Sequence, residues 1–265
     1  MKSHIRQRTV CIVESLIAKI IGTKLFEYFL FHILVMSQER SNTIQSIDRL
    51  RSLGACLASF GLSESQLKQD QWVIWRSEMK RGGYFVDIGA CYPIRLSNTH
   101  NLEANWGWTG LLIEPNPYLV PELKAQRTSK VLNLAVGQSP SIELSIAINP
   151  EFSSARSKEE GLHKLYAPTG EKVTVECKTL REIFEVHNVP KDFDYLSIDV
   201  EGSEMSVLES GDWKIWRPKF ITVEHNFSEA RNEINNFLKS VGYERDESIS
   251  VFSWDDLYVR ITNGN

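Results

Sequence analysis

The spacing of hydrophobic positions changes along the chain and divides it in two. Over residues 1–70 apolar residues recur at helical spacing, with Gly22, Gly54 and Gly61 as interruptions. From Gly82 onward, short runs rich in β-branched and aromatic residues alternate with stretches of helical period. The pattern predicts a helical N-terminal extension over residues 1–70 and a domain of alternating strands and helices over residues 71–265.

The second part is expected to contain seven strands with helices between several of them. The predicted strands are 84–88, 110–114, 130–136, 142–148, 173–177, 195–200 and 220–224. The predicted helices are 97–105, 117–127, 180–187, 203–210 and 228–241. Such alternation indicates an α/β fold with a doubly wound, mostly parallel sheet. Residues 149–170 are predicted to form a long polar loop, and 251–254 with 257–261 a hairpin at the sheet edge.

Composition limits which kinds of binding partner and which cellular compartment we expect for the protein. The chain has 265 residues, a formal charge of -4, 42% hydrophobic and 24% charged residues, which is ordinary for a globular protein. Mild acidity argues against a nucleic-acid partner. The four cysteines are far apart and form no C-x-x-C pair, which argues against a zinc site or a disulfide framework. We therefore expect a reducing, cytoplasmic location.

Two apolar stretches near the N-terminus, 10–21 and 25–36, are each interrupted by charged residues. Neither is the run of about 20 mostly uncharged residues that a membrane-spanning helix needs. The first has the spacing of an amphipathic helix, which would pack on the domain or in a dimer. The alternative is peripheral membrane contact through residues 5–36. The pattern does not predict the oligomeric state.

The carboxyl ends of the first two predicted strands carry the residues expected to bind a ligand. The first strand ends in Asp87-Ile-Gly89-Ala90, and the second is followed by Glu114 and Asn116. In doubly wound sheets, an acid at the end of the second strand can accept hydrogen bonds from both hydroxyls of a ribose. A dinucleotide would also need G-x-G-x-x-G for its pyrophosphate, but the chain offers only Gly89 there. An adenosyl group without phosphates is the ligand that fits this turn better. A dinucleotide-dependent oxidoreductase is therefore the weakest alternative function.

Five blocks then resemble a known family: FVDIGACYPIRLSNT, WTGLLIEPNP, LNLAVG, DYLSIDVEGSEMSVLES and ITVEHN, in this order. Together they look like the FkbM family of S-adenosylmethionine-dependent methyltransferases, over roughly residues 70–245. The resemblance implies a class I methyltransferase fold with a seven-stranded sheet whose last strand is antiparallel. It also implies S-adenosyl-L-methionine as cofactor and methyl transfer to a hydroxyl of a small molecule or a glycan.

The resemblance also implies roles for individual residues. Asp87, Gly89 and Ala90 would form the first cofactor turn, and Ser97 and Asn98 would hold the methionine end of the cofactor. Glu114 would hold the ribose, with Asn116 nearby, and Ala135 at the end of the third strand would lie near the adenine. Asp199 would face both the cofactor and the substrate.

One stretch departs from the family pattern. Many relatives have Gly-Ala-Asn-Asp-Gly where this chain has Gly89-Ala-Cys-Tyr-Pro93. A proline has no N–H to donate, and a lost glycine can narrow the turn. The alternative function is therefore a degenerate, non-catalytic interaction module that no longer binds the cofactor.

Methyl transfer to an alcohol needs a group that removes the hydroxyl proton. The expected base is Asp199 or His225, with Glu201 as a third candidate for the catalytic site. Glu201 also suits the start of a helix, where the dipole favours an acid. We assign no metal to the site, although Asp199, Glu201, Glu224 and His225 could converge as ligands of a hard divalent cation.

Overall fold

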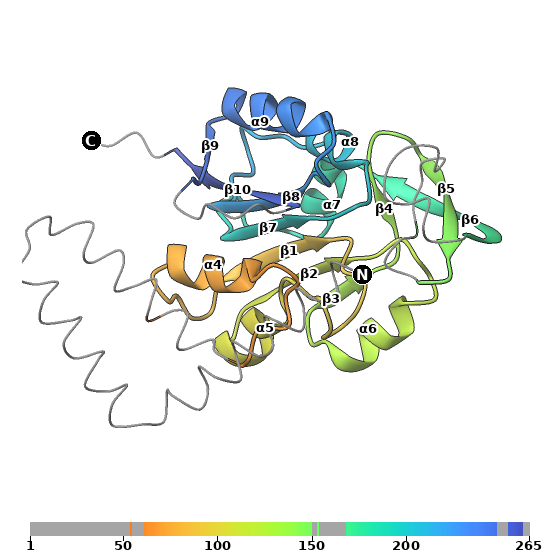
Figure 1. The fold of residues 1–265 in the computed structure, drawn as a ribbon, viewed down its shortest axis with the longest axis horizontal. Coiled ribbons are helices and arrows are strands. Elements are labelled where there is room, and N and C mark those ends of the chain that lie inside the picture. Colours follow the sequence, from red (N-terminus) through yellow and green to blue (C-terminus); the bar gives the residue numbers. More distant parts are fainter. Residues whose placement is uncertain (1–53, 55–60, 150–152, 154–167, 248–253, 262–265) are drawn as a thin grey trace, which may run out of the picture. The chain divides into compact units, whose positions relative to one another are not determined.

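The computed structural model describes residues 54, 61–149, 153, 168–247 and 254–261 (Figure 1). The chain divides into two compact units, Met1–Leu62 and Ser63–Asn265. Almost all described residues belong to the second unit. The predicted helical extension up to residue 60, the amphipathic segment 5–36, most of the loop 149–170 and residues 251–253 of the expected hairpin lie outside the described residues.

The second unit contains a seven-stranded sheet in the order β3-β2-β1-β7-β8-β10-β9. The bounds of its strands are Tyr84–Ile88 (β1), Thr109–Ile113 (β2), Lys130–Leu132 (β3), Tyr195–Ile198 (β7), Phe220–Glu224 (β8), Tyr243–Arg245 (β9) and Asp255–Arg260 (β10). Strands β3, β2, β1, β7 and β8 pair in parallel, and β10 is antiparallel to β8 and β9. The predicted α/β fold with a mostly parallel sheet and an antiparallel last strand is confirmed.

Two details of the predicted sheet are wrong. The tail strand β10 lies between β8 and β9 instead of forming an edge hairpin, since the short strand β9 occupies the edge. The strand predicted over 130–136 is divided: β3 ends at Leu132, and Ala135–Val136 forms β4. Strand β4 joins a second, three-stranded sheet with β5 (Ser141–Ala147) and β6 (Pro168–Lys178), in the order β4-β6-β5. Ala135 therefore begins β4 and does not end the third strand.

Helices cover both faces of the main sheet. Their bounds are Gln69–Arg76 (α4), His100–Trp106 (α5), Val120–Gln126 (α6), Leu180–Val186 (α7), Glu204–Glu209 (α8) and Ala230–Ser240 (α9). Val86 and Ile88 of β1 belong to a core cluster that includes apolar residues of α7, α8 and α9. The alternate residues of a strand point to the opposite face. There Asp87 accepts a hydrogen bond from Thr99 before α5, and Trp72 of α4 packs edge-on against Phe220.

Local sequence explains several of these elements. All four residues of β7, including Ser197, are buried because the strand lies inside the sheet with both faces covered. Helix α7 begins after Thr179, whose hydroxyl accepts from the Glu182 N–H while the Glu182 carboxyl accepts from the Thr179 N–H. This capping box fixes the helix start. None of the helices in the described ranges is long and apolar enough to span a membrane.

Candidate cofactor and active site

The parallel strands β1, β2, β7 and β8 end at one edge of the sheet, and their ends carry the candidate site. Gly89 follows β1, Glu114 follows β2, Asp199 follows β7, and Glu224 is the last residue of β8. Ligands of doubly wound sheets bind at this edge. The structure therefore brings together residues that are up to 137 positions apart along the chain, from Asp87 to Glu224.

The turn after β1 can only be made by glycine. Gly89 has a φ of +84°, and a Cβ built on it would lie 1.7 Å from the carbonyl oxygen of Asp199. The N–H groups of Gly89 and Ala90 donate to the Ile113 carbonyl, and the Asp199 N–H donates to the Ile88 carbonyl. This close backbone packing holds the turn against the ends of β2 and β7.

Glu114 is buried at the end of β2, with 5% of its surface exposed. Its Oε2 accepts from the Cys91 N–H at 2.8 Å, and its Oε1 accepts from the Asn116 N–H at 2.8 Å. Burial raises the pKa of its carboxyl to about 7, against the two backbone donors, which lower it. The acid predicted to hold the ribose is thus directed into the protein and not at bulk water.

Asn116 is 1% exposed and adds a donor beside this acid. Its Oδ1 accepts from the Tyr118 N–H at 3.0 Å, while its Nδ2 is buried with no hydrogen-bond partner. Buried donors of this kind normally have a partner. An adenosyl group offers acceptors for the Asn116 donor and ribose hydroxyl donors for the Glu114 carboxylate, so the two residues suit the predicted cofactor.

The stretch Cys91-Tyr92-Pro93, which departs from the family pattern, forms a loop that is held by several contacts. Cys91 has a φ of +48°, in the left-handed region. The Arg95 guanidinium lies 4.1 Å from the centre of the Tyr92 ring, and the Pro93 carbonyl accepts from Arg127 Nη1 at 3.2 Å. The loop is therefore anchored by two arginines, and its Cys91 N–H already bonds to Glu114.

Three other predicted cofactor residues use their side chains within the protein. Asp87 is 3% exposed, accepts from Thr99 Oγ1 at 2.6 Å, and has its pKa raised by burial. Ser97 Oγ accepts from Arg127 Nη1 at 3.1 Å. Asn98 donates to Ser197 Oγ at 3.1 Å. These residues brace the loop between β1 and α5, and their predicted contact with the cofactor stays a prediction.

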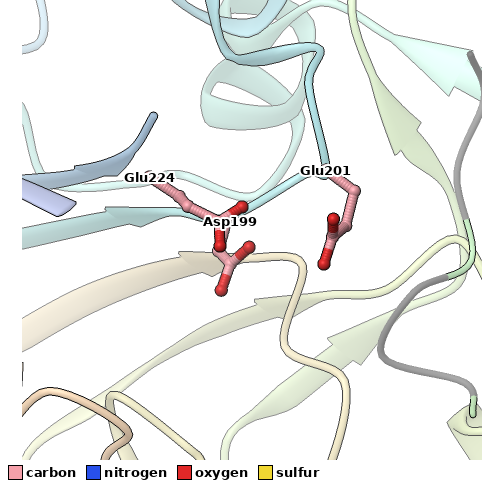
Figure 2. Close-up of side chains that lie close together, drawn as sticks. All are labelled: Asp199, Glu201 and Glu224. Atoms are coloured by element: carbon pink, nitrogen blue, oxygen red, sulfur yellow. The ribbon is translucent and has the colours of Figure 1, made fainter. Parts of the chain in front are cut away.

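Two of the predicted catalytic residues, Asp199 and Glu201, form an acidic cluster with Glu224 (Figure 2). One carboxylate oxygen from each residue lies within 4.8 Å of those of the other two. Burial and, next, the nearby charge of Asp255 raise the pKa of Asp199 to about 7. Burial also raises the pKa of Glu224, together with the charge of Asp199. Glu201 has a φ of +54° in the turn before α8.

His225 lies beside this cluster but is held by its own neighbours. It is 3% exposed, its Nδ1 accepts from the Phe227 N–H at 3.0 Å, and its Nε2 lies 3.6 Å from Asp256 Oδ1. Asp256 in turn accepts from Arg231 Nη2 at 2.7 Å. A neutral imidazole with Nδ1 as acceptor carries its proton on Nε2.

Sequence reasoning missed three buried polar residues that support the site. Arg127 bonds to the loop before α5, and Gln69 donates from Nε2 to Asp255 Oδ2 at 2.7 Å. Arg127 and Asp255 lie outside the sequence blocks that suggested the family. An arginine after a polar helix and an aspartate in a tail give no periodic or motif signal, so only the fold identifies them.

With this geometry in place, comparison with protein families gives one match that decides the assignment. Residues 87–245, more than half of the chain, match the methyltransferase FkbM domain. The chain belongs to the FkbM methyltransferase family. Its family and fold are therefore those of S-adenosylmethionine-dependent methyltransferases, as the five sequence blocks indicated. No curated protein sequence matches the chain.

Solved structures with a similar fold are distant from this FkbM protein. One is a precorrin-6y C5,15-methyltransferase from Geobacter metallireducens GS-15, with 8% identity, a TM-score of 0.40, and coverage of 72% of this chain and 88% of that chain. Another is a TehB-like SAM-dependent methyltransferase from Corynebacterium glutamicum, with 12% identity, a TM-score of 0.37, and coverage of 73% and 88%. The family assignment rests on the sequence match and not on these similarities.

Proposed function

We propose that this FkbM protein is an O-methyltransferase that acts on a hydroxyl of a small molecule or a glycan. The observation that carries the proposal is the position of Asp199. It follows β7, its carbonyl oxygen packs against the Gly89 turn, and burial raises the pKa of its carboxyl to about 7. A carboxylate whose pKa lies near the working pH is suited to act as a general base.

The protein residues position the acceptor and take its proton. The cofactor, when bound, supplies the methyl group as an electrophile. Methyl transfer would form an oxygen–carbon bond at the acceptor and break the carbon–sulfur bond of the cofactor, and Asp199 would accept the hydroxyl proton. Glu114 and Asn116 would hold the ribose and its surroundings, which keeps the reacting centre at the ends of β1 and β7.

The contacts of the His225 ring with Phe227 and Asp256 disfavour His225 as the base. Its Nδ1 lone pair is engaged by the Phe227 N–H, and its Nε2 faces Asp256. A proton acceptor needs a free lone pair within reach of the hydroxyl. We therefore assign His225 to positioning the loop after β8 and leave Asp199 as the base.

A non-catalytic module is the second candidate, and one contact favours it. The Cys91 N–H donates to Glu114 Oε2, an oxygen that would accept from a ribose hydroxyl. With this contact in place, a ribose hydroxyl would have to share that oxygen with the Cys91 N–H. The non-catalytic module is the candidate in which the turn stays closed over Glu114.

The remaining expectations are part of the proposal. We propose a cytoplasmic protein with a small-molecule or glycan acceptor and no nucleic-acid partner, consistent with its charge of -4. Contact with a membrane surface would involve residues 5–36, which lie outside the described residues.

Substitution of the base tests the proposal. Asp199→Asn should leave S-adenosylhomocysteine binding within a few-fold of wild type but lower the rate of methyl transfer by about 100-fold or more. The measurements are calorimetric titration and formation of S-adenosylhomocysteine with a panel of hydroxylated acceptors. Full activity in Asp199→Asn would remove Asp199 from its role, and loss of cofactor binding in wild type would favour the non-catalytic module.

A further inference from the structure

The cluster of Asp199, Glu201 and Glu224 brings three carboxyl groups together, whereas a general base needs only one. Three carboxylates from two strand ends and one turn direct oxygens into one small space, within 4.8 Å of one another (Figure 2). The charges that act most strongly on Asp199, besides Glu224, are those of Asp255, Glu204 and Asp87, and all of these are acidic. The region therefore concentrates negative charge.

Several other buried carboxylates of this protein are paired with basic side chains, while others, such as Asp87 and Glu114, accept hydrogen bonds from neutral donors. Asp194 pairs with Lys80 at 2.7 Å, Asp256 with Arg231 at 2.7 Å, and Glu103 with Arg127 at 3.0 Å. Among the described residues, no lysine, arginine or histidine forms an ion pair with Asp199 or Glu224. Buried carboxylates are normally paired, protonated or bound to a metal, so Asp199 and Glu224 need a proton or a bound cation to compensate for their proximity.

Glu224 supplies an independent observation. The residue is 6% exposed, and its Oε2 is buried with no hydrogen-bond partner. Figure 2 shows its carboxyl group directed at Asp199. An orphan carboxylate oxygen that points at a second carboxylate has no stabilising contact unless a proton or a cation lies between them.

We propose that Asp199, Glu201 and Glu224 form a binding site for a hard divalent cation, Mg²⁺ or Mn²⁺. Carboxylate oxygens are the ligands these ions prefer, and they are commonly held by few protein groups with several positions left to water or substrate. Three protein ligands would leave room for the acceptor oxygen.

The role of the ion rests on the proposed O-methyl transfer. A bound cation lowers the pKa of a hydroxyl that coordinates it, as it does for water. Asp199 has two oxygens, and the one not bound to the cation keeps a lone pair for the hydroxyl proton. The cation and the base would thus act on the same acceptor oxygen from one side.

Binding of Mn²⁺ tests the site without any acceptor. The metal-free full-length protein is titrated with Mn²⁺ and followed by calorimetry and by the electron paramagnetic resonance of free Mn²⁺. We expect one site per chain, weakened by about 100-fold or more in Glu224→Gln and in Glu201→Gln. Glu209→Gln is the matched control, because it removes an exposed carboxylate from the neighbouring helix α8. It should bind like wild type.

The outcomes separate this proposal from the proposed function. Each sample is also titrated with S-adenosylhomocysteine in the presence of EDTA, and its melting temperature confirms folding. Absence of Mn²⁺ binding by folded wild type at millimolar metal, or equal binding by wild type and the two cluster variants, overturns the metal site. Cofactor binding that persists in those samples leaves the methyltransferase assignment intact. If Glu224→Gln fails to fold, the partly exposed Glu201→Gln decides alone.

Discussion

Glu114 carries a buried carboxyl whose pKa of about 7 makes its charge sensitive to pH near neutrality. Ribose hydroxyls donate to the ionised form, so binding should favour ionisation and affinity should rise with pH. Between about pH 6 and pH 8 the ionised fraction grows about ten-fold, and affinity for methylthioadenosine should increase by a similar factor. This ligand lacks the methionine end, so it adds no carboxyl or amino group that titrates.

Calorimetry of wild type and Glu114→Gln checks this expectation. The variant should bind more weakly and without the rise, because its amide does not titrate. An equally steep rise in both proteins would show that another group is responsible.

Gly89 gives a second prediction at the scale of one residue. Gly89→Ala adds a methyl group 1.7 Å from the Asp199 carbonyl oxygen and places alanine at a φ of +84°. We expect a loss of about 3 kcal/mol or more in the free energy of unfolding, measured by urea denaturation. Gly170→Ala is the matched control, because its φ is +85° and nothing lies within 4 Å of the added Cβ. If both variants lost the same stability, backbone strain alone would account for the effect.

At the scale of elements, the loop between β1 and α5 is held in place mainly by one side chain, that of Arg127. Arg127, whose side chain is fully buried, donates to Pro93 O, Ser97 Oγ and Thr99 Oγ1 and pairs with Glu103 at 3.0 Å. Arg127→Ala would leave Glu103 buried without its cation, so we expect a loss of about 3–5 kcal/mol. Arg181→Ala, which breaks an exposed pair with Glu185, should cost less than about 1 kcal/mol.

Urea denaturation of both variants measures this difference. A loss in Arg127→Ala no larger than in Arg181→Ala would show that the loop is held by other contacts. Cofactor titration of the folded Arg127→Ala protein would then show whether the loop still binds its ligand.

At the element scale, the sequence predicted the inner strands better than the edges. Strands β1 and β8 have the predicted bounds because both are short runs rich in β-branched and aromatic residues. Strand β9 has only three residues, too few for an alternating pattern, and it was missed. The position of β10 between β8 and β9 depends on long-range pairing that periodicity does not encode.

The candidate site was predictable where a residue ends a strand within a recognisable block, as for Glu114 and Asp199. It was not predictable where function depends on what surrounds the residue. The engagement of His225 by the Phe227 N–H and the orphan oxygen of Glu224 both depend on the three-dimensional arrangement.

For the whole molecule, the buried acids at the strand ends predict how stability changes with pH. Glu114, Asp199 and Asp255 have folded pKa values raised to about 7, about 7 and about 6 from ordinary values of 4.5, 3.8 and 3.8. Their contribution to the free energy of unfolding is fully present below the ordinary pKa values and is lost as the pH rises through the pKa values of the folded state. Asp194 and Glu103, whose pKa values are lowered, lose their contribution only at more acidic pH.

The metal-free protein should therefore melt at a lower temperature at about pH 8 than at about pH 5.5, by about 5 °C or more. Glu114→Gln should reduce the difference, since it removes one of the titrating groups. Scanning calorimetry across this range measures it. A melting temperature that rises toward pH 8 would contradict the assigned burial of these acids.

Titration of the full-length protein with S-adenosylhomocysteine tests the central claim most directly. The wild type should bind, and Glu114→Ala should weaken binding by about 100-fold, because two hydrogen bonds from the ribose to a charged acceptor are lost. Glu201→Ala, outside the ribose site, should change binding by only a few-fold. No heat at millimolar ligand from folded wild-type protein, or equal losses in the two variants, would contradict the assignment of this edge of the sheet as the cofactor site.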